Sequence, residues 1–257
     1  MATLTPKQVL ITGASSGIGA AVAARLAREG AALTLLGRDA AKLRAIAESL
    51  ESAASVKTFV VNLSRAASIP NALRKIAAGL PHLDALVHSA GTFTRGSALD
   101  DSQVLLEEMM QVNVYAPMAI TRELLPALER GRGTIVFINS TGVQRPQRIT
   151  GQYIASKHAL RAMADSLREE INPRGVRVTT IFPGRTSTPM QQSLHEMEGR
   201  SYEPERLLQP ADVAELAATA INLPPSAELT DLFVRPMQTA GALASAQTKP
   251  GRKRKTK

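Results

Sequence analysis

The sequence has no cysteine and no tryptophan, and it has only five phenylalanines and three tyrosines among 257 residues. Without cysteine the chain forms no disulfide and uses no thiolate, which fits a reducing compartment, so we expect a cytoplasmic protein. The four histidines are scattered without metal-ligand spacing, and we expect no metal site. No apolar run approaches the ~20 residues that a membrane-spanning helix needs. No signal-peptide stretch precedes the first predicted strand.

Positive charge is concentrated near the carboxyl-terminal end. The formal net charge is +9, but six positive charges lie within residues 249–257, which leaves +3 for the remainder. Hydrophobic periodicity stops at Met237, so we expect residues 237–257 to be a disordered basic tail. Such a tail can contact nucleic acid or anionic lipid. We favour a solvated tail and do not expect nucleic acid as a partner.

Short apolar segments alternate with segments of helical spacing along the first 236 residues. The alternation is typical of an α/β fold in which helices cover both faces of a parallel sheet. We therefore predict a single doubly wound, Rossmann-type domain over residues 1–236, with about seven strands and no internal repeat or second domain. The predicted strands are residues 8–12, 32–36, 56–61, 83–89, 135–140, 176–182 and 229–234.

A glycine-rich turn follows the first predicted strand. The apolar residues 8–12 lead directly into residues 13–19, and strong helix formers follow over residues 20–29. A strand, a glycine turn and a helix in this order place a pyrophosphate at the N-terminus of the helix. The glycines permit a tight turn, close approach of phosphates and close packing of helix and strand, and the serines add hydroxyl donors. The expected cofactor contacts are Gly13, Ser15, Ser16, Gly17, Ile18 and Gly19.

The end of the second predicted strand bears on the choice of dinucleotide. Sites for NAD place an acid there for the ribose 2′-hydroxyl, whereas an arginine accommodates the 2′-phosphate of NADP. This chain has Gly37-Arg38 at that point. Because a guanidinium can pair with a phosphate through two hydrogen bonds, we expect NADP. The alternative is that Arg38 is a surface residue opening the next helix, with Asp39 as its N-cap.

A serine, a tyrosine and a lysine form the candidate catalytic group. Ser140 ends a buried strand, and Tyr153 and Lys157 lie one turn apart on the same face of the following helix. An ammonium beside a phenol favours the phenolate, so we expect the pKa of Tyr153 to fall below ~10 and the phenol to serve as general acid or base. Ser140 can donate a hydrogen bond to a substrate oxygen. The alternative for the pair alone is a solvated lysine beside a packed tyrosine.

With these motifs in this order, residues 7–235 resemble the short-chain dehydrogenase/reductase family. The resemblance implies an oxidoreductase that interconverts a carbonyl and an alcohol by hydride transfer with NADPH. Ser140 would then hold the carbonyl oxygen, Tyr153 would deliver the proton, and Lys157 would tune Tyr153 and bond the ribose hydroxyls. The family pattern implies further cofactor contacts from Asn62, Leu63, Ala90, Gly91, Tyr153, Lys157, Pro183, Gly184, Thr186 and Thr188.

Two positions depart from the family pattern. Asn62 stands where an acid commonly bonds the adenine amino group, and its carbonyl can accept the same bond. The sequence reads His88-Ser89-Ala90-Gly91 where the family has Asn-Asn-Ala-Gly. The last two residues keep the small floor under the ribose. His88 either replaces part of the lost amide bonding or is a buried, satisfied core histidine.

Asn113 lies inside a long predicted helix, residues 101–128. Asparagine is a poor helix former and its neighbours are apolar, so we expect a buried polar role. The resemblance implies a catalytic part, in which Asn113 kinks the helix and holds a water on a proton path to Lys157. The alternative is an asparagine satisfied by the backbone.

Residues 189–207 hold two methionines, Leu194, Tyr202 and several charges, which is consistent with a mobile lid that closes on substrate, and the resemblance implies a homodimer or homotetramer. The lid would be residues 186–207, with an ordinary surface helix as the alternative, and the subunits would meet through helices 101–128 and 152–171. The polar, basic loop 143–152 suits an oxygen-rich or anionic small-molecule substrate, which the sequence does not identify. A second hypothesis is a non-catalytic dinucleotide-binding regulator whose basic tail contacts nucleic acid or an acidic partner. The intact serine, tyrosine and lysine count against it.

Overall fold

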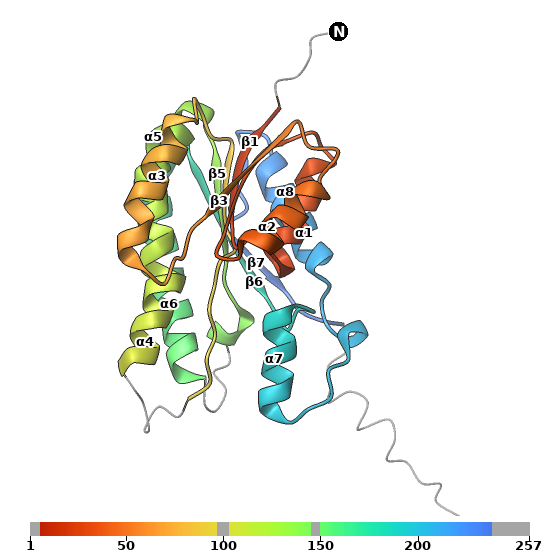
Figure 1. The fold of residues 1–257 in the computed structure, drawn as a ribbon. Helices are drawn as coiled ribbons and strands as arrows, with labels where there is room; N and C mark the ends of the chain where they lie inside the picture. The colour runs from red at the N-terminus through yellow and green to blue at the C-terminus, as the bar shows by residue number, and fades with distance from the viewer. Residues whose placement is uncertain (1–5, 97–102, 145–149, 238–257) are drawn as a thin grey trace, which may run out of the picture.

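The computed structural model of the chain describes residues 6–96, 103–144 and 150–237, and its sheet is parallel throughout (Figure 1). The strand order is β3-β2-β1-β4-β5-β6-β7. This confirms the predicted doubly wound α/β fold with about seven parallel strands. The strands are β1 (Gln8–Thr12), β2 (Ala32–Gly37), β3 (Ser55–Val60), β4 (Ala85–His88), β5 (Thr134–Ile138), β6 (Arg177–Pro183) and β7 (Asp231–Val234).

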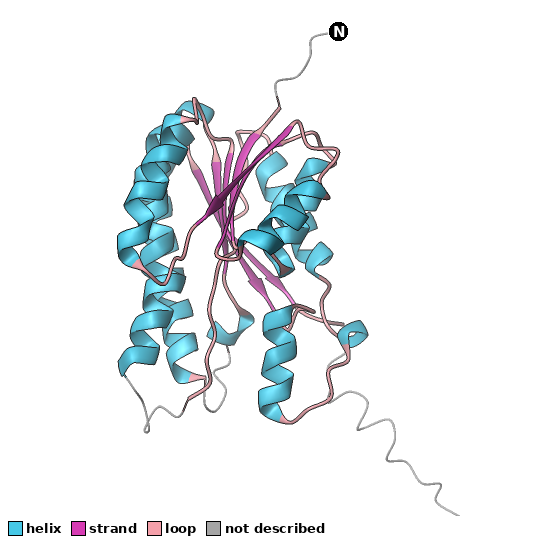
Figure 2. Cartoon of the chain, in the orientation of Figure 1, coloured by secondary structure: helices cyan, strands magenta, loops and turns pink. Residues whose placement is uncertain are grey.

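Helices cover both faces of the sheet (Figure 2). Because each face is buried under helices, most strands are continuous apolar runs rather than alternating ones. A separate hydrophobic core fills the space on each side of the sheet. One face carries α1 (Gly17–Ala27), α2 (Ala40–Glu48) and α8 (Pro210–Asn222). The other carries α3 (Ile69–Ala78), α5 (Ala116–Gly131) and α6 (Gly151–Ile171).

Helices α4 (Gln103–Met110) and α7 (Pro189–Glu198) lie beyond these layers, and one long predicted helix is divided in the structure. The helix predicted over residues 101–128 consists of α4 and α5, joined by a π-helical turn at Gln111–Tyr115, and residues 101–102 lie outside the described part. Helix α7 extends below the sheet in Figure 1. Short 3-10 turns occupy Ala66–Ser68, Thr141–Val143, Asn172–Arg174 and Pro204–Arg206.

The strand order reverses between β1 and β4. These strands are neighbours, with Val9 opposite Ala85 and Thr12 opposite His88, although β2 and β3 separate them along the chain. Doubly wound sheets bind ligands at the carboxyl ends of the strands at such a point. The fold therefore brings the glycine turn after β1 and the Ala90-Gly91 segment after β4 to the expected ligand position.

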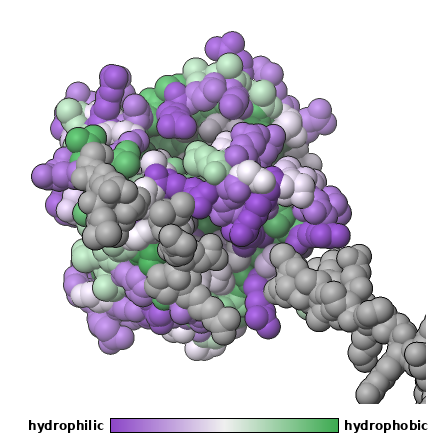
Figure 3. Space-filling model, turned by 90° about the horizontal axis from the view of Figure 1, so that it is seen from below, coloured by the Kyte–Doolittle hydropathy of each residue, from purple (hydrophilic) through white to green (hydrophobic). Residues whose placement is uncertain are grey.

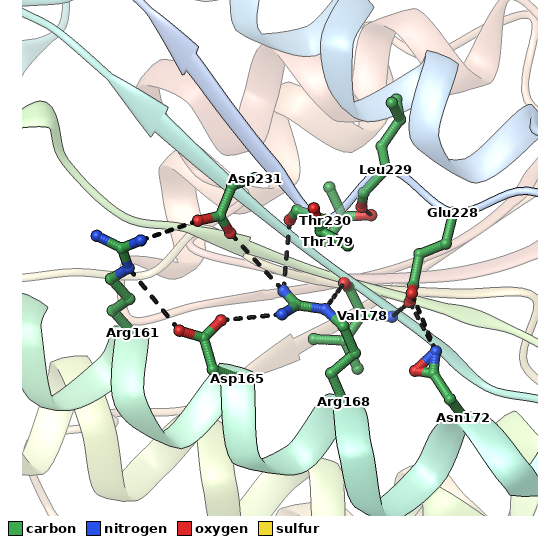
Figure 4. Close-up of polar contacts among 10 residues, drawn as sticks. All are labelled: Arg161, Asp165, Arg168, Asn172, Val178, Thr179, Glu228, Leu229, Thr230 and Asp231. Atoms are coloured by element: carbon green, nitrogen blue, oxygen red, sulfur yellow. Dashed lines mark hydrogen bonds and ion pairs between the residues drawn. The ribbon is translucent and has the colours of Figure 1, made fainter.

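The edge strand β7 is fastened to α6 by a network of charges (Figure 4). Arg168 donates hydrogen bonds to the main-chain oxygen of Val178 and to the carboxylate of Asp165, each at 2.9 Å. Asp231 on β7 lies 3.2 Å from the guanidinium of Arg161 and 3.8 Å from that of Arg168. The network joins α6 to the β6–β7 side of the sheet, from which residues 183–188, four of them predicted cofactor contacts, emerge.

None of the described helices is both long enough and apolar enough to cross a bilayer. Within the same residues, histidines and carboxylates do not come together in a group of three or more that would suit a metal ion. The predicted basic tail lies outside the described part of the chain from residue 238 onward.

Candidate active site

The predicted site residues gather at the carboxyl edge of the sheet, which is the lower edge in Figure 1. Four neighbouring strands each have predicted site residues at or just after their carboxyl ends. The glycine turn follows β1, Gly91 follows β4, Ser140 follows β5, and Pro183 ends β6. Figure 3 views this edge end-on, where hydrophobic side chains (green) show between hydrophilic ones (purple). Residues far apart in the sequence therefore share one edge of the molecule.

The glycine turn has the backbone that its sequence predicts. Gly13 and Gly17 have φ values of +68° and +54°, in the left-handed region that favours glycine. A Cβ on Gly13 would lie 2.7 Å from the main chain of Ala90, and one on Gly17 would lie 3.1 Å from the methyl carbon of Thr188. A Cβ on Gly19 would collide with the carbonyl oxygen of Gly13. The glycines therefore let the first turn of α1, the end of β1 and the segment after β4 approach one another closely.

The N-terminus of α1 points its free N–H groups toward this turn. Ser16 is the N-cap residue in an extended conformation, and its side chain makes no capping hydrogen bond to the helix. The first N–H groups of a helix and its dipole favour an anion. Together with the glycine turn, this helix end fits a pyrophosphate.

Arg38 is exposed directly beyond β2, and β2 packs closely against the glycine turn. A Cβ on Gly37 would lie 3.2 Å from Oγ of Ser15. Asp39 caps α2 by accepting a hydrogen bond from the N–H of Lys42 at 3.0 Å, so its carboxylate is directed to the helix start. The acid next to Arg38 therefore does not oppose a phosphate at this point.

Asn62 is partly engaged in its own turn. Its Oδ1 accepts a hydrogen bond from the N–H of Ser64 at 3.0 Å, and its main-chain oxygen accepts one from Oγ of Ser68 at 2.7 Å. A carbonyl oxygen has a second lone pair. The contact to adenine that the resemblance implies for Asn62 stays a prediction that this geometry permits.

Ser140, Tyr153 and Lys157 meet between the end of β5 and the first turns of α6. The side chains of Ser140 and Tyr153 share a hydrogen bond. Nζ of Lys157 lies 5.8 Å from the centroid of the Tyr153 ring and donates a hydrogen bond to the main-chain oxygen of Ile138 at 2.9 Å. Phe93 packs edge-on against Tyr153, with 4.9 Å between ring centroids. Helical spacing and strand position thus bring the three predicted residues into one group.

Removal from water dominates the acid–base properties of this group. Tyr153 is half-buried, and this burial raises its pKa to about 12, while the hydrogen bond with Ser140 opposes the rise. Burial lowers the pKa of Lys157 to about 8. The predicted lowering of the Tyr153 pKa is therefore wrong for this structure, because desolvation outweighs an ammonium that bonds to Ile138. At neutral pH Tyr153 is a protonated phenol, which is the form that can give a proton.

Asn113 lies at the middle of the π-helical turn and is fully buried. Its Oδ1 accepts a hydrogen bond from the N–H of Thr92 at 2.9 Å. Its Nδ2 donates to the main-chain oxygen of Thr92 at 3.1 Å and to Oγ of Ser156 at 2.9 Å. The side chain is thus satisfied largely by backbone, as one of the two interpretations expects, and π-turns are frequent at functional sites. Its part in a proton path stays a prediction.

Asn139 and Ser156 position the catalytic group and were missed from the sequence. Asn139 donates from Nδ2 to the main-chain oxygen of Lys157 at 3.1 Å and accepts from the N–H of Ser140 at 2.8 Å. Ser156 donates from Oγ to the main-chain oxygen of Tyr153 at 2.7 Å. Asn139 therefore ties the end of β5 to α6. The sequence did contain a signal for Asn139, because it is a polar residue placed directly between an apolar strand and Ser140.

The loop after β6 reaches the glycine turn. Thr186 donates from Oγ1 to the main-chain oxygen of Gly184 at 3.0 Å. Thr188 caps α7 by accepting from the N–H of Gln191 at 3.2 Å, and its methyl group lies against Gly17. Helix α7 falls within the predicted lid, residues 186–207.

His88 is a buried core histidine, as one interpretation expects, but it is satisfied only in part, because its Nδ1 has no hydrogen-bond partner among the described residues. It is 2% exposed, its ring stacks on Phe137 at 4.9 Å, and Nε2 lies 2.9 Å from Oγ1 of Thr121. Burial lowers the pKa of His88 to about 3, so the ring is neutral.

Residues 145–149 of the predicted substrate loop lie outside the described part of the chain.

The sequence is similar to that of a known protein family and its members. Residues 7–199 match the family model described as short chain dehydrogenase. A protein of Sinorhizobium fredii, named as an uncharacterized short-chain type dehydrogenase/reductase, is 35% identical over an alignment of 232 residues, and the match covers 88% of this chain and 90% of that protein.

Solved structures share the fold over nearly the whole chain. An alcohol dehydrogenase from the archaeon Thermococcus sibiricus, complexed with 5-hydroxy-NADP, is similar with a TM-score of 0.82 and 28% identity, covering 91% of this chain and 97% of that one. A variant of actinorhodin polyketide ketoreductase with NADPH is similar with a TM-score of 0.81, 28% identity and the same two coverages.

Proposed function

This chain belongs to the short-chain dehydrogenase family, and we propose that it is an NADPH-dependent oxidoreductase that interconverts a carbonyl and an alcohol by hydride transfer. One observation carries the proposal: the phenol of Tyr153 shares a hydrogen bond with Ser140 and lies one helical turn from Lys157. This group stands beside a strand-order reversal whose glycine turn fits a pyrophosphate. A proton donor and a dinucleotide site are the two parts that the reaction needs.

In this proposal the chain's own residues would hold NADPH, which supplies the hydride when bound. The N–H groups of the glycine turn and α1 would hold the pyrophosphate. Arg38 would pair with the 2′-phosphate, and Lys157 would bond the ribose hydroxyls. Thr186 and Thr188, with the preceding Pro183 and Gly184, would bond the carboxamide of the nicotinamide and so select the ring face that meets the substrate.

Two side chains act on the substrate oxygen in this proposal. Ser140 donates a hydrogen bond to the carbonyl oxygen and holds it beside the phenol. Tyr153 gives its proton to that oxygen as negative charge develops there. The ammonium of Lys157 stabilises the resulting phenolate. Asn113 would hold a water on the path by which a proton reaches Lys157, and its hydrogen bond to Ser156 fixes its side chain beside the first turns of α6.

The relatives support both the cofactor and the reaction. An alcohol dehydrogenase bound to an NADP derivative and a ketoreductase bound to NADPH have the same fold. We propose a small-molecule carbonyl or alcohol as the substrate and residues 1–236 as the functional domain.

We also propose a homodimer or homotetramer through α4, α5 and α6. Large apolar side chains on these helices and the turn between them are exposed: Val104 by 68%, Tyr115 by 57% and Met163 by 44%. Exposed apolar groups on adjacent helices are typical of protein interfaces. Sedimentation velocity tests this, and a monomer at all concentrations would contradict it.

The test of the function is coenzyme consumption. Purified protein is mixed with NADPH or NADH and with pooled aldehydes, ketones, quinones and β-ketoacyl thioesters, and coenzyme absorbance is followed. We expect at least one pool to consume NADPH faster than NADH. No oxidation or reduction of any pool, together with salt-sensitive DNA binding that needs residues 249–257, would support the regulator instead.

A further inference from the structure

Helix α7 is attached to the molecule by polar contacts rather than by hydrophobic packing. Neither hydrophobic core, as the described residues define them, includes a residue of α7. Met190 and Met197 are exposed by 44% and 56%, whereas the polar side chains of Gln191 and His195 are buried. Surface helices of globular proteins usually have the opposite arrangement. A helix with a buried polar face stays in place only if that face is fully bonded.

Glu198, the last residue of α7, is the centre of these bonds. Its carboxylate and the guanidinium of Arg185 form a two-pronged pair, with Nη1–Oε2 at 3.1 Å and Nη2–Oε1 at 3.0 Å. The side chain of Glu198 is 10% exposed, and Arg200 lies 3.2 Å from Oε2. Nη1 of Arg185 also lies 3.5 Å from Nε2 of the buried His195. Arg185 thus joins the loop after β6 to two positions on the buried face of α7.

Arg95 reaches the same end of α7 from the loop after β4. Its Nη1 donates to the main-chain oxygen of Met197 at 3.2 Å, where the dipole of the helix is negative. Arg95 follows Phe93 by two residues, and Phe93 packs against Tyr153. The carboxyl end of α7 is therefore held from the two loops that also border the catalytic group.

The other end of α7 meets the glycine turn. Thr188 caps the helix, and its methyl group lies against Gly17. The ten residues of α7 form a stiff rod of about 15 Å. A displacement at Glu198 therefore moves Thr188, which the proposed function assigns to the nicotinamide carboxamide.

We propose that Glu198 and Arg185 are positioning residues, which hold α7 in place so that Thr188 stays against the glycine turn. In this proposal the two side chains act through Thr188 rather than by binding substrate or cofactor themselves. Arg95 adds a third contact from the opposite loop. The part of this inference that concerns NADPH rests on the proposed function, whereas the part that concerns the order of α7 does not.

The test compares E198Q with a matched control on the same helix. E196Q removes the same charge from an exposed glutamate, whose carboxylate contacts Gln192 at 3.3 Å. Hydrogen exchange of peptides covering residues 186–199 is measured on the full chain without cofactor. We expect exchange in α7 to be at least about tenfold faster in E198Q, since a partly buried charge-assisted pair is lost. E196Q should match the natural protein.

A double-mutant cycle and a binding measurement complete the test. If the pair is the operative contact, R185Q combined with E198Q should speed exchange little more than either change alone. NADPH affinity should fall about fivefold or more in E198Q, in line with a loosened Thr188. Equal exchange in E198Q and E196Q overturns the positioning role. Faster exchange with unchanged NADPH affinity overturns the coupling to Thr188, and a natural protein that binds no NADPH overturns the proposed function while the exchange result still stands.

Discussion

Nζ of Lys157 donates a hydrogen bond to the main-chain oxygen of Ile138 at 2.9 Å, which joins α6 to the end of β5. Ile138 precedes Ser140 by two residues, and Lys157 follows Tyr153 by one helical turn. The bond therefore fixes the strand that presents the serine relative to the helix that presents the phenol. Lys157 is 4% exposed, and burial lowers its pKa to about 8.

This burial predicts a pH dependence of stability. The ordinary pKa of a lysine is 10.5 and the folded value is about 8. Between these values the unfolded chain binds a proton that the folded chain does not, so the free energy of unfolding rises with pH. The full shift corresponds to about 3 kcal/mol. Denaturant unfolding of the cofactor-free protein from about pH 7 to about pH 10 should show this rise, and K157M should lack most of it.

The pH range of that experiment is limited by Tyr153. Its pKa is raised from 10.0 to about 12, so above about pH 10 the unfolded chain loses a proton that the folded chain keeps, and stability falls. If the free energy of unfolding changes with pH in the same way for the natural protein and K157M below that limit, burial does not lower the pKa of Lys157.

Arg38 should decide between the two dinucleotides. The R38A variant removes a charge-assisted pair with the 2′-phosphate, so we expect NADPH affinity to fall about 10- to 100-fold while NADH affinity is unchanged. R44A removes another exposed arginine from the adjoining helix α2 and serves as the control. Titration of both coenzymes measures the effect. Equal losses for NADPH and NADH in R38A would place Arg38 away from the phosphate.

Gly13 and Gly30 offer a matched pair for the glycine turn. Both have positive φ, +68° and +74°, but a Cβ on Gly30 would have nothing within 4 Å, whereas one on Gly13 would lie 2.7 Å from the backbone of Ala90. G30A should cost about 1–2 kcal/mol through backbone strain alone. G13A should cost at least about 1 kcal/mol more, because the main chain must move. Urea unfolding compares them, and equal losses would contradict the close approach of β1 and β4.

Much of the fold and of the candidate site could be predicted because their signals are local. The apolar run before Gly13, the glycine spacing and the following helix formers lie within one short stretch. The spacing of Tyr153 and Lys157 places them on one helical face whatever surrounds them. The alternation of strands and helices along the chain likewise predicts a parallel sheet.

Properties set by distant packing could not be predicted. The pKa of Tyr153 depends on contacts with Phe93, which is 60 residues earlier, and with Ser140. The resemblance implied an irregular helix at Asn113, but the hydrogen bonds of its side chain depend on Thr92 in the loop after β4. The buried polar face of α7 depends on Arg185. In each case the partner comes from another element, so no local pattern records it.

Turnover of the Tyr153→Phe variant tests the central claim most directly, that this phenol is the proton donor. The change keeps the ring and its packing on Phe93 and removes only the hydroxyl. With a substrate identified by coenzyme consumption, kcat should fall at least about 100-fold, and NADPH affinity should stay within about twofold. A Tyr153→Phe protein that turns over at the natural rate would contradict the account.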